Sequence, residues 1–146
     1  MSKFAQGRFD PKNPEKYVGL GSPRYRSSWE WHFMKTCDEH PSIEKWASES
    51  IKIPYKDPLT GRATVYVPDF FIVYSDKTGK KHAELIEIKP ANQMIRENVG
   101  KNVGRQMQYI KNMAKWEAAN AWCKQQGITF RIMNEHDLFH QVHGCW

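Results

Sequence analysis

The chain has 146 residues, of which 40% are hydrophobic and 13% aromatic, and this composition excludes an intrinsically disordered protein. A domain of this length buries about two thirds of its unfolded surface in one core, so no second domain is needed. The formal net charge of +6 favours an anionic partner, most commonly nucleic acid.

The first 25 residues predict a basic N-terminal arm, because prolines and glycines interrupt a stretch rich in lysine and arginine. This segment lacks the apolar run of a signal peptide, and no run in the chain approaches the ~18 residues that cross a bilayer. The three cysteines show no CxxC spacing, so reduced thiols are expected. We therefore expect a soluble, cytoplasmic protein with no membrane partner, divided into an arm (1–25) and one domain (26–146).

A capping-box pattern predicts the first helix. Residues 27–30 read Ser-Ser-Trp-Glu, which matches S-x-x-E, and the helix should continue to about His40, before Pro41. A first strand is predicted from Ile43 to Pro54, followed by a turn over residues 56–61.

A β-hairpin is predicted next. Its strands, Val65 to Tyr74 and His82 to Ile88, are rich in β-branched, aromatic and aliphatic residues. If residues 77–79 form a three-residue loop with Gly79 in the left-handed conformation, Asp69 lies opposite Glu87. A slip of one residue would send these two carboxylates to opposite faces of the sheet.

This register would bring Asp69, Glu87 and Lys89 together. Opposed residues have Cβ atoms about 4.5–5.5 Å apart, so two carboxylates there repel each other unless a cation neutralises them. Lys89 points to the same face as Glu87. Taken singly, Asp69 also suits a turn, and Glu87-Ile88-Lys89 an edge-strand ion pair. The apolar run from Phe70 to Tyr74 favours a central strand covered on both faces.

Glu30 lies within the apolar arc of the first helix. On a helical wheel with about 100° per residue, Glu30 falls between Cys37 and Met34 and close to Phe33. A carboxylate aimed into a core is costly unless it is paired or binds a metal, so the arc favours a functional role. The third position of a capping box is the alternative.

A long helix is predicted from about Arg105 to Gln126, ending at Gly127, with a last strand from Ile128 to Met133. The inward stripe of this helix would comprise Tyr109, Ile110, Met113 and Trp116. Lys111 and Lys115 would lie on its solvated face. The candidates for contacts with DNA phosphates flank the presumed cleft, and they are Arg24, Arg26, Lys101 and Arg105. The tail residues His136, His140, His143 and Cys145 suggest zinc, but an amphipathic tail is the favoured interpretation.

Together, Glu30 on a helix, Asp69 at a strand start and Glu87-x-Lys89 on the next strand resemble the PD-(D/E)xK nuclease superfamily. Within it, the segments 25–30, 67–70 and 87–90 look like the TnsA-type endonucleases of heteromeric transposases, and more so like the head-completion nucleases of large contractile-tailed phages. The resemblance implies an α/β fold with a restriction-endonuclease-like core, in which helices flank a mixed sheet of about four strands.

The resemblance also implies the chemistry of the site. Asp69 and Glu87 would bind Mg²⁺ or Mn²⁺, with the carbonyl of Ile88 as a further ligand and Glu30 as direct or water-mediated support. Lys89 would orient or help deprotonate the attacking water and stabilise the charged transition state. TnsA-like proteins can have glutamine at the position of Glu87, so the number of metals stays open.

The implied activity is metal-dependent hydrolysis of phosphodiester bonds in double-stranded DNA, at packaged DNA ends during phage head completion. The implied location is the host cytoplasm or the virion head, with phage head or portal proteins as candidate partners. A non-catalytic structural or DNA-binding head protein and a transposase subunit are the alternatives. The presence of all four catalytic residues, Glu30, Asp69, Glu87 and Lys89, favours the enzyme.

Overall fold

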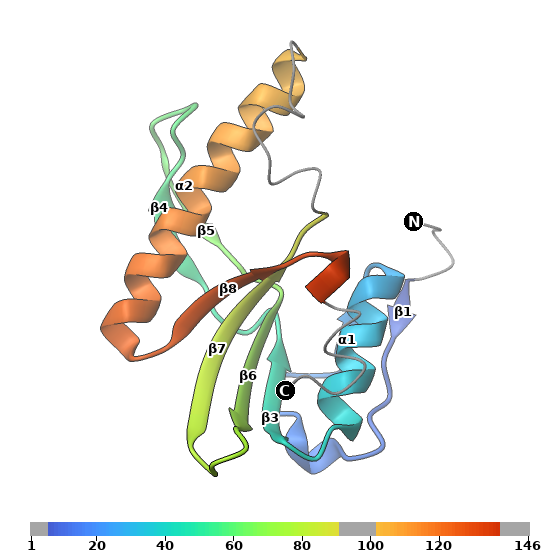
Figure 1. Ribbon diagram of the computed structural model, residues 1–146. Helices are drawn as coiled ribbons and strands as arrows, with labels where there is room; N and C mark the ends of the chain where they lie inside the picture. Colours follow the sequence, from blue (N-terminus) through green and yellow to red (C-terminus); the bar gives the residue numbers. More distant parts are fainter. Residues whose placement is uncertain (1–5, 91–101, 138–146) are drawn as a thin grey trace.

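The computed structural model describes residues 6–90 and 102–137. A four-stranded sheet in the order β3-β6-β7-β8 forms its centre, with helix α1 (Ser28–Glu39) and helix α2 (Val103–Gln126) beside it (Figure 1). The strands are β3 (Ile43–Ser48), β6 (Phe70–Ser75), β7 (Lys81–Ile88) and β8 (Thr129–Met133). β3, β6 and β7 are antiparallel neighbours, whereas β8 runs parallel to β7. The predicted α/β fold with a mixed sheet of four strands is confirmed.

Both faces of strands β6 and β7 are covered by packed side chains. Ile72 and Ile86 belong to the core cluster that includes residues of α1, whereas Leu85 and its partner Phe71 belong to or pack against the cluster that includes residues of α2. Alternating side chains of one strand therefore enter two different cores. This arrangement places the ends of β6 and β7 between two packed layers, where charged side chains lose solvent.

The predicted hairpin register is confirmed. β6 and β7 pair Phe70 with Ile86, and the N–H of Asp76 donates to the carbonyl of Lys80 at 2.9 Å. Gly79 has φ +86°, the left-handed conformation that the three-residue loop requires. The turn thus sets which side chains meet at the far end of the hairpin.

Two predicted strands are each divided in the structure. The stretch predicted as one strand from Ile43 to Pro54 forms β3 and a separate strand β4 (Ile53–Lys56), and Val65 to Tyr74 contains the end of β5 (Ala63–Tyr66) and then β6. β4 pairs with β5 as a second, two-stranded sheet. Pro68 explains the second break, because proline has no N–H to donate to a sheet.

The N-terminal arm packs on the body in the described part, residues 6–25. Phe9 is buried with its ring centroid 5.8 Å from that of Trp46. The buried carboxylate of Asp38 accepts hydrogen bonds from the backbone N–H groups of Lys12 and Asn13, both at 2.9 Å. The arm also contains a short helix (Pro14–Lys16) and strands β1 (Gly7–Arg8) and β2 (Arg24–Tyr25), which pair with each other.

Replacing Asp38 with Ala is expected to lower the free energy of unfolding by about 3 kcal/mol, because two backbone N–H groups lose their acceptor. Urea denaturation followed by circular dichroism measures this change. Glu39→Ala, one position further on the same helix and exposed, is the matched control and should change stability by less than about 0.5 kcal/mol. Equal stability of both variants would contradict the anchoring role of Asp38.

Helix α2 packs on the sheet through its C-terminal two thirds. Trp116, Ala119 and Cys123 are buried, whereas Met107 and Ile110 are each 45% exposed. The predicted inward stripe is therefore correct for Trp116 and wrong for Ile110, since the N-terminal end of the helix projects beyond the sheet (Figure 1). No helix of the described residues has the length and apolar character to span a membrane.

Candidate active site

The hairpin register places Asp69 and Glu87 together. Asp69 immediately precedes β6, and the pairing of Phe70 with Ile86, continued by one residue, sets it opposite Glu87. Asp69 Oδ2 accepts a hydrogen bond of 2.7 Å from the backbone N–H of Ile88, which joins the start of β6 to the end of β7. Glu87 is only 8% exposed.

Burial makes ionisation of both carboxylates unfavourable. Burial raises the pKa of Asp69 well above its usual range, the charge of Glu87 adds to the rise, and the N–H of Ile88 opposes it. Burial also raises the pKa of Glu87, against the opposing effects of its partners Tyr66 and Lys89. A site with this much confined negative charge favours a bound cation.

Lys89 places a positive charge beside Glu87. Its Nζ lies 3.6 Å from Glu87 Oε2, and its side chain is only 21% exposed. The N–H of Lys89 donates to the carbonyl of Met133 on β8, so the parallel strand holds the backbone of Lys89 in place. Asp69, Glu87 and Lys89 thus meet as the sequence predicts.

Glu30 completes the capping box of α1 and also interacts electrostatically with the acidic pair. Its N–H donates to Ser27 Oγ, and its Oε1 accepts from the N–H of Arg26 at 3.1 Å. Burial raises the pKa of Glu30, and the charges of Glu49 and Glu87 act in the same direction. The charge of Glu30 in turn raises the pKa of Asp69. The capping geometry is therefore present, while a role for Glu30 towards a metal stays a prediction.

Comparison with known proteins gives two matches. Residues 40–135 match the model of the TnsA-like endonuclease N-terminal family. The chain is also 31% identical to the "Head completion nuclease" of Enterobacteria phage T4 over 144 residues, which cover 90% of this chain and 92% of that protein. The chain belongs to the TnsA-like endonuclease family. Asp69, Glu87 and Lys89 lie inside the segment matched to the family, whereas Glu30 precedes it.

Two further residues lie at this site that the sequence did not predict as site residues, Tyr66 and Lys115. The hydroxyl of Tyr66, at the end of β5, donates to Glu87 Oε1 at 2.8 Å within the buried part of the site. Lys115 on α2 lies with its Nζ 5.7 Å from the centre of the Tyr66 ring. Burial raises the pKa of Tyr66, and the charge of Glu87 adds to the rise.

The expectation that Lys115 belongs to a solvated helix face is wrong. Its side chain is half-buried, and burial lowers its pKa while the charge of Glu87 raises it. Lys115 directly precedes the buried Trp116, so it borders the packed face, and its ammonium group lies over the Tyr66 ring. Its neighbour one turn earlier, Lys111, lies with its Nζ 3.7 Å from Asp57 Oδ2.

If Glu87 binds Mg²⁺ for DNA cleavage, Tyr66→Phe is expected to reduce the cleavage rate about tenfold and to raise the Mg²⁺ concentration needed for half-maximal rate. Partners that orient a metal-binding carboxylate have effects of this size. Initial rates across a Mg²⁺ titration measure both effects. Tyr55→Phe is the matched control, since Tyr55 packs against the same core cluster. If Tyr66→Phe behaves like this control, the hydrogen bond does not position Glu87.

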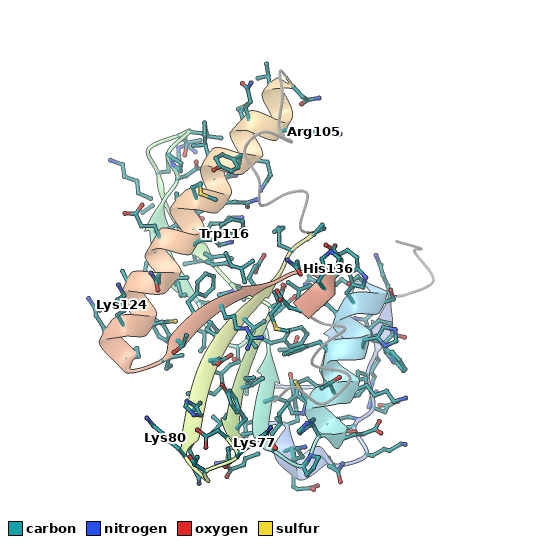
Figure 2. The ribbon with its side chains drawn as sticks, viewed as in Figure 1. Lys77, Lys80, Arg105, Trp116, Lys124 and His136 are labelled. Atoms are coloured by element: carbon teal, nitrogen blue, oxygen red, sulfur yellow. The ribbon has the colours of Figure 1, made fainter. Side chains whose placement is uncertain are left out.

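The candidate DNA-binding residues fall in different places. Arg24 and Arg26 are exposed and lie just before α1, and Arg26 forms a 3.0 Å ion pair with Glu49. Arg105 lies on the projecting end of α2 (Figure 2). Lys101 and the tail residues from 138 onwards lie outside the described residues. Of the three candidates that the structure describes, Arg24 and Arg26 lie just before the N-terminus of α1.

The donor set fits a hard divalent cation that is shared with substrate. Among residues 6–90 and 102–137, no three His, Cys, Asp or Glu side chains are grouped as a metal site. Mg²⁺ is commonly bound by one or two carboxylates together with substrate phosphates, rather than by a cage of protein ligands. Asp69 and Glu87 provide two such carboxylates, and their confined charge matches this mode.

Proposed function

We propose that this protein is a metal-dependent endonuclease that hydrolyses phosphodiester bonds in double-stranded DNA. The observation that supports it best is the meeting of Asp69, Glu87 and Lys89 at one end of the hairpin, in a chain of the TnsA-like endonuclease family. The likeness to the phage T4 head completion nuclease extends over 92% of that protein. It supports a role in phage head completion, at packaged DNA ends and beside head or portal proteins.

Each residue of the site has a part in this reaction. Asp69 and Glu87 would hold Mg²⁺ or Mn²⁺, with the Ile88 carbonyl as a further oxygen ligand. When bound, the ion would polarise the phosphate and lower the pKa of an attacking water. Tyr66 and the N–H of Ile88 hold the two carboxylates in orientation. Lys89 presents its ammonium to the negative charge that develops on the phosphate oxygens.

The chemical outcome is one hydrolysed bond. The oxygen of water forms a bond to phosphorus while the bond from phosphorus to a sugar oxygen breaks. The sugar oxygen takes up a proton, and the attacking water loses one. The charge of Glu30 raises the pKa of Asp69. Glu30 would support the metal through a water molecule.

Incubation of the purified protein with supercoiled plasmid tests the proposal. Nicked and linear products are expected with Mg²⁺ or Mn²⁺ and not with EDTA. A rise in melting temperature on addition of Mg²⁺ would report metal binding independently of cleavage. DNA binding without cleavage under any cation condition would support the non-catalytic head protein instead.

A further inference from the structure

A hollow of about 450 Å³ lies beside the candidate active site. Its walls come from the N-terminal arm, the segment before α1 and the end of β3. Pockets of roughly 300–1,000 Å³ take small molecules, so this space fits about one nucleotide. None of the four candidate catalytic residues lines it.

The hollow and the active site share a wall. Glu49 lines the hollow, and its N–H donates to the carbonyl of Asp69 at 2.9 Å. Arg26 also lines the hollow, and its N–H donates to Glu30 Oε1 at 3.1 Å. Two hydrogen bonds therefore join the lining of the hollow to the candidate active site, one at the Asp69 carbonyl and one at the Glu30 side chain.

Two tyrosines line the hollow and have fixed positions. The ring of Tyr17 packs against Trp46 with centroids 4.6 Å apart. Tyr25 packs against the core cluster next to α1. A side chain at Gly19 would clash with the Tyr17 hydroxyl, so glycine is needed for the ring to lie there. Aromatic rings held in this way stack with unpaired bases.

The charged groups of the hollow suit a phosphate. Arg24 and Arg26 line it, and a guanidinium binds phosphate through paired N–H donors. The ion pair between Arg26 and Glu49 is exposed on the arginine side, whose side chain is 70% accessible. Exposed pairs of this kind are weak, so exchanging Glu49 for a phosphate costs little.

The rim of the hollow carries an exposed apolar side chain. Leu20 lines the hollow and is 98% exposed. Many DNA-binding proteins insert such side chains between neighbouring bases and unstack them. An apolar side chain at the mouth of a pocket can separate a base from its neighbour in the stack. The pocket behind it, with aromatic and cationic walls, can then hold that base.

We propose that this hollow binds one unpaired nucleotide of the DNA strand beside the scissile phosphate. This inference rests on the proposed nuclease function and adds a preference for DNA with an unpaired end or tail. Tyr17 and Tyr25 stack on the base, Arg24 and Arg26 hold the phosphate, and Leu20 abuts the last base pair.

Binding of fluorescent DNA duplexes, measured by anisotropy in EDTA at one salt concentration, tests this proposal. One duplex is blunt, and two others carry three unpaired nucleotides at a 5′ or a 3′ end. The protein is expected to bind a tailed duplex about tenfold more tightly than the blunt one, as stacking of one base provides. Leu20→Ser and Arg24→Gln, both at exposed positions, should reduce this preference to less than about threefold.

Lys77→Gln is the matched control, because Lys77 lies at the hairpin turn, at the opposite end of β6 from Asp69 (Figure 2). It should keep the full preference for tails. Equal binding of blunt and tailed duplexes by the unmodified protein, or an unchanged preference in both hollow variants, would overturn the proposal. Plasmid cleavage without a preference for tails refutes the hollow alone, whereas a preference for tails without plasmid cleavage refutes the nuclease function alone.

Discussion

Replacing Asp69 with Asn is expected to lower the rate of Mg²⁺-dependent DNA cleavage by about 10³-fold, equivalent to about 4 kcal/mol of transition-state stabilisation. Asn keeps the size of the side chain and an oxygen that accepts from the N–H of Ile88. It removes the negative charge that the proposed divalent cation would need beside Glu87. Single-turnover cleavage of a plasmid at saturating protein measures the change.

The same variant separates a chemical role from a folding role. Without metal, Asp69→Asn should melt at the same or a higher temperature than the unmodified protein, because burial and Glu87 make the Asp69 charge unfavourable. The stabilisation by Mg²⁺ should be lost. Asp10→Asn, at an exposed aspartate of the arm, is the control and should retain both cleavage and the Mg²⁺ effect. Normal cleavage by Asp69→Asn would show that Asp69 is not part of the active site.

Lys89→Met is expected to lower the cleavage rate by about 10²- to 10³-fold, the usual effect of losing one group that stabilises developing charge. Methionine retains much of the aliphatic packing of the largely buried side chain but provides no ammonium. Because Asp69 and Glu87 remain, the rise in melting temperature with Mg²⁺ should persist. Cleavage rates and thermal melts on the same preparation measure the two effects.

Two further variants test whether the ammonium group of Lys89 is responsible for the lost activity. Lys80→Met, at the turn of the hairpin far from the site, should cleave DNA at the normal rate (Figure 2). Lys89→Arg keeps the charge in a larger and planar group, so it should recover part of the activity. Loss of the Mg²⁺ effect in Lys89→Met would instead assign Lys89 to metal binding or to folding of the site.

Local sequence determined the hairpin, the start of α1 and the end of α2. Gly79 accepts a left-handed conformation, and the short turn it permits sets the register through β6 and β7. Ser27 and Gly127 cap α1 and α2 at the predicted places. These features depend on residues within a few positions of each other, so the sequence pattern contains the information needed to predict them.

The tertiary structure decided which distant side chains complete the site. Tyr66 reaches Glu87 from β5, which ends before Pro68 and belongs to a different sheet from β7. Lys115 reaches Tyr66 because α2 packs in the same core cluster as residues of β4 and β5. The hollow likewise requires the arm to lie against β3. Such contacts depend on packing between segments far apart in the chain, and a periodic pattern describes only one segment at a time. By itself the sequence therefore determined the acidic pair and its lysine, while long-range packing decided the groups that surround them.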